Sequence, residues 1–146
     1  MRPGVRRAAA VVVFAVSLGL AGCGGVPQTL DAEALKKQAE AIESLAAEGA
    51  LVAGDVSEGD TTSTFVRVHA EALGENAQTV VAVLASDQAK PAHGLSQAVG
   101  RAHALARSVR ADLAELEDLP SSEAAASLRG RLERKADAAK RLAESL

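Results

Sequence analysis

Residues 95–116 read LSQAVGRAHALARSVRADLAEL, and this stretch decides the fold. Its apolar residues recur at steps of three and four, which is the spacing of one face of an α-helix. The stripe comprises Leu95, Ala98, Val99, Ala102, Leu105, Ala106, Val109, Leu113 and Leu116. Most other positions are polar or charged, so the sequence predicts a long amphipathic helix with one buried side.

The rest of the chain beyond residue 29 has the same character. Ala, Leu, Glu, Lys and Arg are strong helix formers and dominate it. Breaks rich in Gly, Pro, Asp or Ser interrupt it at 54–60, 86–91 and 118–122. We therefore predict four helices of similar length, at 30–53, 61–86, 91–117 and 121–145.

Helix-start signals accompany three of these segments. The candidate N-caps are Asp60, Thr61 or Thr62 for the second helix and Ser121 or Ser122 for the fourth. Pro91 suits the first turn of the third helix, because that position needs no backbone N–H.

The first and fourth helices also carry one apolar stripe each. In the first it follows alternating steps of four and three, through Leu35, Ala39, Ile42, Ala46, Gly49 and Ala53. Four of these six residues are Ala or Gly, so a neighbouring helix can approach closely. The fourth helix has Leu128, Leu132, Ala139, Leu142, Ala143 and Leu146. Lys135 interrupts this stripe, and we expect its stem along the core edge and its amine in water.

Helices of similar length joined by short connections pack as antiparallel neighbours. No run with the period of a β-strand competes with them. The predicted fold is therefore all-α, an antiparallel up-down-up-down four-helix bundle over residues 30–146.

The second helix places two polar side chains on its apolar side. With about 100° between successive residues, His69 and Asn76 fall near the middle of the predicted buried side. That side is defined by Phe65, Ala72, Leu73, Val80 and Val83. We expect His69 and Asn76 inside the bundle, with Gln38 and Thr79 as candidate partners. Two interpretations stay open: the pair sets helix register, or it lines a ligand pocket in the core.

The sequence lacks the spacings that catalytic or cofactor sites require. No Glu-x-x-His pair involves His69, His93 or His103, and the only methionine is Met1. There is no Gly-x-Ser-x-Gly turn and no Gly-rich phosphate loop. Trp and Tyr are absent, which argues against a nucleic-acid partner. We predict no enzymatic activity, no metal and no cofactor.

Basic residues gather on the fourth helix. They are Arg129, Arg131, Arg134, Lys135, Lys140 and Arg141, in a chain that is otherwise acidic. We expect them mainly to form salt bridges on the exterior of the bundle. Contact with anionic lipid headgroups or an envelope polymer is the other interpretation.

The N-terminus has the layout of a secretion signal. Arg2, Arg6 and Arg7 precede an apolar stretch over 8–20, and small residues follow. Leu20-Ala21-Gly22-Cys23 resembles the lipobox of bacterial lipoproteins, and Cys23 is the only cysteine. The resemblance implies that Cys23 carries a lipid and that the chain is cut directly before it.

The resulting organisation has three parts. Residues 1–22 are the predicted signal peptide, 23–29 the lipidated cysteine with a flexible tether, and 30–146 the bundle. Loss of 1–22 removes three arginines and no acid. It leaves 13 Lys and Arg against 19 Asp and Glu, and the formal charge changes from −3 to −6.

A second resemblance concerns Gly59-Asp60-Thr61-Thr62-Ser63-Thr64-Phe65-Val66-Arg67-Val68-His69-Ala70-Glu71, preceded by Ala47-Glu48-Gly49-Ala50-Leu51. It is similar to a segment of small lipoproteins of high-GC actinobacteria. This similarity implies a location and a helical fold, and it supplies no activity.

The sequence thus predicts a protein anchored to the extracytoplasmic face of the cell membrane through the lipid on Cys23. We expect it to act as a helical interaction or structural module whose partner is another envelope protein or a second copy of itself. The alternative is an envelope lipoprotein that binds a ligand in a core pocket around His69 and Asn76.

Overall fold

The computed structural model describes residues 29–86, 90–119 and 121–146. They form the helices α1 (Ala32–Glu58), α2 (Ser63–Ala85), α3 (Ser96–Glu115) and α4 (Ser122–Glu144), and a short 3₁₀ helix, η1 (Leu116–Asp118). The described residues contain no strand; their β-type pairing is an isolated bridge between Leu30 and Pro91. The prediction of an all-helical bundle of four helices is confirmed.

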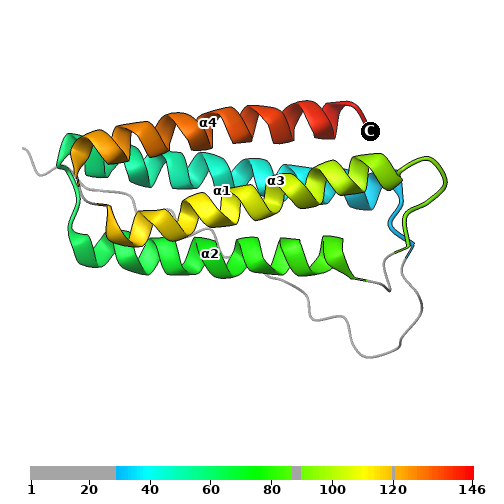
Figure 1. The fold of residues 1–146 in the computed structure, drawn as a ribbon, viewed down its shortest axis with the longest axis horizontal. Coiled ribbons are helices and arrows are strands. Elements are labelled where there is room, and N and C mark those ends of the chain that lie inside the picture. Colours follow the sequence, from blue (N-terminus) through cyan, green and yellow to red (C-terminus); the bar gives the residue numbers. More distant parts are fainter. Residues whose placement is uncertain (1–28, 87–89, 120) are drawn as a thin grey trace, which may run out of the picture.

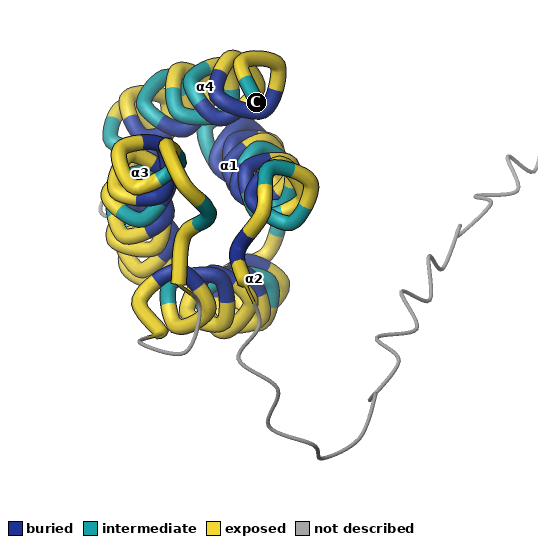
Figure 2. The backbone as a smooth tube through the Cα atoms, turned by 90° about the vertical axis from the view of Figure 1, so that its right-hand side faces the viewer, coloured by how far each residue is buried: buried dark blue, intermediate teal, exposed yellow. Residues whose placement is uncertain are grey.

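The helices lie side by side along their lengths (Figure 1). Viewed along the bundle, α4 and α2 lie on opposite sides, with α1 and α3 between them (Figure 2). The closest association in the bundle is that of α1 with α4. None of the described helices combines the length and the apolar character that crossing a membrane would require.

The first helix is longer than predicted, because the break expected at 54–60 begins only at Gly59. Gly54 is buried inside α1, where its lack of a side chain leaves room for the Arg129 side chain. Gly59 ends the helix in the left-handed conformation, with φ of 78°. Its N–H donates to the carbonyl oxygens of Asp55 and Val56, so the helix ends in a typical glycine cap.

The predicted caps of α2 and α4 are confirmed. Thr62 Oγ1 accepts from the N–H of Phe65 at 3.3 Å, and Ser121 Oγ accepts from the N–H of Ala124 at 3.1 Å. Each bond satisfies an N–H that has no partner within the helix.

The third helix starts later than predicted, at Ser96. Pro91 lies outside it, because the backbone on both sides of this proline pairs with Leu30. Leu30 donates to the Lys90 carbonyl, and Ala92 donates to the Leu30 carbonyl, both at 3.1 Å. Gly94 then turns the chain with φ of 86°. The α2–α3 connection is thereby tied to the residues that precede α1.

The small-sided stripe of α1 is buried inside the chain. All six predicted residues are buried, and Leu113 and Leu132 fill the space beside Gly49. A Cβ at residue 49 would lie 2.5 Å from Leu113 Cδ2 and 3.2 Å from Leu132 Cδ1. α3 and α4 therefore fill the stripe, which leaves no part of it for a second copy at this point.

Candidate functional site

The structure corrects the predicted orientation of α2. Leu73 and Val80 face the core as expected, but Phe65, Ala72 and Val83 lie on the outside. The core-facing residues are Val66, Ala70, Leu73, Ala77, Val80 and Leu84. They follow alternating steps of four and three, the same repeat that α1 buries.

Polarity explains why this stripe is the buried one. It contains no polar side chain, whereas the other side of the helix includes His69, Asn76 and Thr79. Burying those three groups would require a hydrogen-bond partner for each. Turning them outward removes the requirement, so α2 buries its wholly apolar side.

The expectation that His69 and Asn76 lie inside the bundle is therefore wrong. Asn76 is exposed and His69 is half-buried at the surface. Thr79 Oγ1 donates to the Glu75 carbonyl within its own helix at 3.1 Å. Gln38 lies beside a surface hollow. These polar residues do not form a core pocket.

The core space next to α2 is apolar and tightly filled. It has no room for a water molecule. Its walls are Ile42, Leu45, Ala77, Val80, Ala106 and Val109, none of which has a polar side-chain atom. No observation therefore favours the alternative of a polar ligand pocket in the core around His69 and Asn76.

The outward side of α2 is instead a candidate interaction surface, which we call the outer face. It consists of Phe65, Val68, His69, Ala72, Asn76, Thr79 and Val83. None of these side chains is an acid, a lysine or an arginine. Phe65 is 44% exposed, Val68 57% and Val83 37%. Figure 2 shows α2 at the edge of the bundle, with most of its length exposed.

Two aromatic rings mark one end of the outer face. The ring centroids of Phe65 and His69 are 4.1 Å apart, with the planes tilted by 41°. Phe65 is the only Phe, Trp or Tyr after residue 22, and it is not in the core. Aromatic side chains are common anchors at protein interfaces, so this pair is the chemically most distinctive part of the outer face.

A surface hollow adjoins the other end of the outer face. It has a volume of about 390 Å³ and lies between the start of α1 and Val83 of α2. Leu30, Ala34 and Gln38 contribute to its walls. Asp31, Glu33 and Lys37 also line this hollow, so the uncharged surface of α2 meets a charged surface of α1 at Val83.

An ion cluster joins α3 to α4 on another side of the bundle. Lys135 Nζ lies 2.6 Å from Asp112 Oδ2 and 2.9 Å from the Ser108 carbonyl. Arg131 Nε lies 3.5 Å from Asp112 Oδ1, and Arg131 also bonds Glu115. The hydrogen bond that Arg131 donates to Glu115 is the main cause of a raised pKa of Arg131, and the charge of Asp112 adds to it.

This cluster corrects the expectation for Lys135 and shows a residue that the sequence analysis missed. The Lys135 amine bonds to protein groups instead of extending into water. Asp112 is 8% exposed and is the one buried charged residue among those described. Its position seven residues after Leu105, on the edge of the α3 stripe, is the signal that would have identified it.

The predicted basic surface of α4 divides into two parts. Arg129 pairs with Glu133 at 2.9 Å and with Glu58 of α1 at 3.4 Å. The hydrogen bond and charge of Glu133 raise the pKa of Arg129. Arg134, Lys140 and Arg141 form no ion pair within the described ranges. Salt bridges therefore account for Arg129, Arg131 and Lys135, and not for Arg134, Lys140 and Arg141.

The remaining predicted sites have a simple placement. His93 is exposed in the turn before α3, and His103 is half-buried on α3. Residues 29–86, 90–119 and 121–146 contain no group of three or more His, Cys, Asp or Glu that could hold a metal ion. Cys23, the lipobox and the predicted signal peptide lie outside the described residues.

Comparisons of this chain with protein-family models, with curated proteins and with solved structures gave no match.

Proposed function

We propose that this protein is a lipid-anchored docking module of the cell envelope, without catalytic activity. An antiparallel up-down-up-down bundle is held at the extracytoplasmic face of the membrane through a lipid on Cys23. The outer face of α2 contacts a helix of a second envelope protein. The observation that carries the proposal is the uncharged character of this exposed face, which includes three large apolar side chains.

The shape of the outer face favours a helical partner. It extends from Phe65 to Val83, which corresponds to ~27 Å at 1.5 Å per residue. An elongated uncharged strip of this length, with exposed apolar side chains along it, matches one side of an amphipathic helix, a common mode of recognition. The carboxylates of Glu71 and Glu75 border this strip on one side, and they can orient a helix that carries positive charge.

The exposed apolar side chains have no role in the core. Val68 is mostly exposed and therefore contributes little to the stability of the fold. A single exposed apolar residue on a protein surface needs no explanation. Several exposed apolar residues on one uncharged strip do need an explanation. The other large apolar residue exposed in the described ranges is Leu51, which stands alone on α1.

The proposed anchor would keep this module close to the membrane. Thr29, the first described residue, follows Cys23 by six positions. A chain spans at most about 3.5 Å per residue, so the lipid and the start of the bundle cannot be more than ~21 Å apart. A diacylated or triacylated cysteine would provide lasting attachment, unlike a single acyl chain.

The anchor is tested by replacing its acceptor. We expect the wild-type protein to fractionate with membranes and to partition into detergent, and Cys23→Ala to accumulate as uncleaved or soluble material. Ser86→Ala is a control that leaves the cysteine intact. Identical fractionation of wild type and Cys23→Ala would contradict the anchor.

The docking face is tested by crosslinking in the native envelope. A photoreactive amino acid at Val68 or Ala72 should give a crosslinked product with one partner protein. The same amino acid at Ala111, which is exposed on α3, should not. A product that contains only two copies of this chain would identify self-association and exclude a separate partner. Equal products from all three positions would contradict a specific face.

A further inference from the structure

The groove between α3 and α4 is built from two facing rows of residues. On α3 the row is Arg101, Leu105, Ser108, Asp112 and Glu115; on α4 it is Arg131, Lys135, Ala138 and Leu142, continued by Ser145 directly after the helix. Both rows alternate steps of four and three, so each follows one side of its helix. The ion cluster around Asp112 and Lys135 closes one half of this groove.

The other half of the groove is hollow. The hollow has a volume of about 410 Å³, and its walls are Arg101, Leu105, Ala138, Arg141, Leu142 and Ser145. Most of its surface is apolar, since Leu105, Ala138 and Leu142 form the floor. Arg101 and Arg141 thus border an apolar floor of a size that admits a small ligand or part of a larger one.

Neither guanidinium has a carboxylate partner. Arg101 and Arg141 form no ion pair within the described residues, whereas Arg129, Arg131 and Lys135 all do. The two rows explain the difference. Seven residues from Asp112 and from Lys135, in the direction of the hollow, the rows carry Leu105 and Leu142 in place of charged groups. The hollow therefore combines unpaired positive charge with apolar surface.

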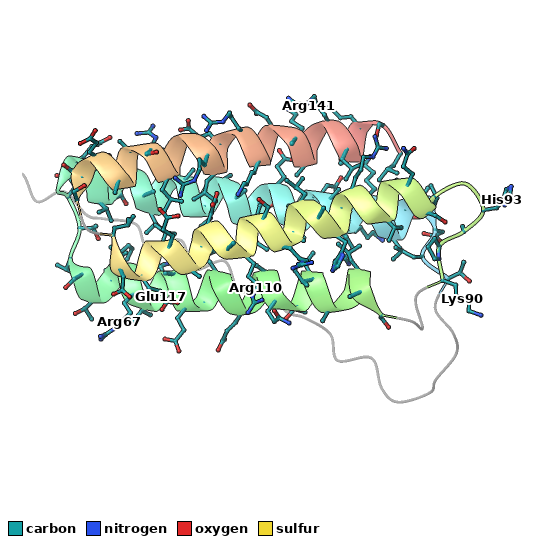
Figure 3. All side chains as sticks on the ribbon, in the orientation of Figure 1. Arg67, Lys90, His93, Arg110, Glu117 and Arg141 are labelled. Atoms are coloured by element: carbon teal, nitrogen blue, oxygen red, sulfur yellow. The ribbon has the colours of Figure 1, made fainter. Side chains whose placement is uncertain are left out.

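The position of the hollow in the bundle bears on what it binds. It lies between the first half of α3 and the last half of α4, at the end of the bundle where α1 begins (Figure 1). Figure 3 shows Arg141 in this half of α4, and Lys90 and His93 at the same end of the molecule. In the sequence, the segment that carries Cys23 directly precedes the start of α1, which lies at this end of the bundle.

We infer that this hollow binds the head of an anionic amphiphile. Arg101 and Arg141 would bind a phosphate or carboxylate group, for which guanidinium is well suited. The first methylenes of the attached chain would lie over Leu105 and Leu142. The source we favour is an anionic phospholipid of the membrane, and this choice of source rests on the proposed lipid anchor. The binding of an anionic group by Arg101 and Arg141 does not depend on the lipid anchor.

The test uses the full protein recovered from the membranes of a bacterial host and reconstituted into vesicles. One set of vesicles contains phosphatidylcholine alone, and the other contains phosphatidylcholine with phosphatidylglycerol. Flotation with the phosphatidylcholine vesicles reports the anchor. Native mass spectrometry of the protein released from the mixed vesicles reports the lipid retained by the hollow. Failure of the anchor and failure of the hollow are thereby separate results.

We expect the wild-type protein to retain phosphatidylglycerol over phosphatidylcholine. Arg101→Gln with Arg141→Gln should weaken retention about tenfold or more, since a charge-assisted hydrogen bond contributes ~1.5–3 kcal/mol. The matched control, Arg67→Gln with Arg110→Gln, removes the same charge from exposed sites outside the hollow and should retain the lipid. Circular dichroism of all variants should be unchanged.

Three results would overturn the inference. The first is equal retention of the two lipids by wild type. The second is equal loss in the hollow variant and the control variant, because it would mean that only net charge matters. The third is full displacement of the lipid by millimolar inorganic phosphate, because a plain anion site would not need the apolar floor. Retention of phosphatidylglycerol by a wild-type protein that fails to float would support the hollow and contradict the anchor.

Discussion

The interface between α1 and α4 and the outer face of α2 are opposite in construction. α1 brings Ala39, Ala46, Gly49 and Ala53 to its interface, and these small residues let α4 approach closely. The outer face of α2 carries Phe65 and other large apolar side chains and remains uncovered. In this bundle the size of an apolar side chain therefore does not indicate burial. In α1 and α2, the buried stripes are distinguished by an uninterrupted spacing without polar side chains.

The largest effect is expected in the closely packed region. Leu132→Ala should lower the free energy of unfolding by about 2–5 kcal/mol, because it leaves a cavity beside Gly49 and Leu113. Val68→Ala on the outer face removes apolar atoms that are already exposed and should change stability by less than about 0.5 kcal/mol. Urea unfolding followed by circular dichroism compares the two. Similar losses would mean that the outer face is covered.

The ion cluster should have the next largest effect. Asp112→Ala should lower the free energy of unfolding by about 1–3 kcal/mol, because it leaves the partly buried amine of Lys135 with only the Ser108 carbonyl. Asp112→Leu with Lys135→Met removes both charges and should recover most of that loss. The same unfolding measurement applies. A double variant as unstable as the single one would show that the cluster itself stabilises the fold.

Two glycines should respond to alanine with opposite signs. Gly49→Ala should destabilise by about 1–2 kcal/mol, because overpacking against Leu113 exceeds the gain in helix propensity. At Gly74 of α2 a Cβ meets nothing within 4 Å, so Gly74→Ala should stabilise by ~0.5–1 kcal/mol. Thermal melts of both variants measure the difference. A stabilising Gly49→Ala would contradict the close approach of the helices around residue 49.

The smallest effect on stability should accompany the largest effect on docking. Phe65→Ser with Val68→Ser removes the most apolar part of the outer face and should shift unfolding by no more than about 0.5 kcal/mol. The photocrosslinked product from position 72 should nevertheless disappear. Leu51→Ser removes an exposed apolar residue from another surface and serves as the control. Loss of the crosslink in both variants, or in neither, would contradict docking through the outer face.

Much of this arrangement follows from patterns that are visible along the chain. The spacing of Leu35, Ile42, Leu113 and Leu132 predicts which sides of α1, α3 and α4 are buried, since a single apolar stripe leaves only one orientation. The caps at Thr62 and Ser121 are equally local, because a hydroxyl three residues before a free N–H is enough to form them.

Other features depend on residues that are distant in sequence. Gly54 does not end α1, because the helix continues where Arg129 of α4 occupies the space beside it. Pro91 does not begin α3, because its neighbours bond to Leu30. No local pattern contains these partners, so the helix boundaries at both positions were predicted incorrectly.

By itself, the sequence determined the four helices, the buried sides of three of them and the two hydroxyl caps. Only the tertiary structure decided the orientation of α2, which has apolar residues on two sides. The polar-free stripe through Leu73 is buried because His69 and Asn76 would otherwise lose water without gaining partners. Tertiary packing also paired Lys135 with Asp112 and left Arg101 and Arg141 unpaired around a hollow. The spacing of apolar residues is a property of one helix and can be found in its sequence. The pairing of charges depends on which residues of a second helix lie opposite those of the first.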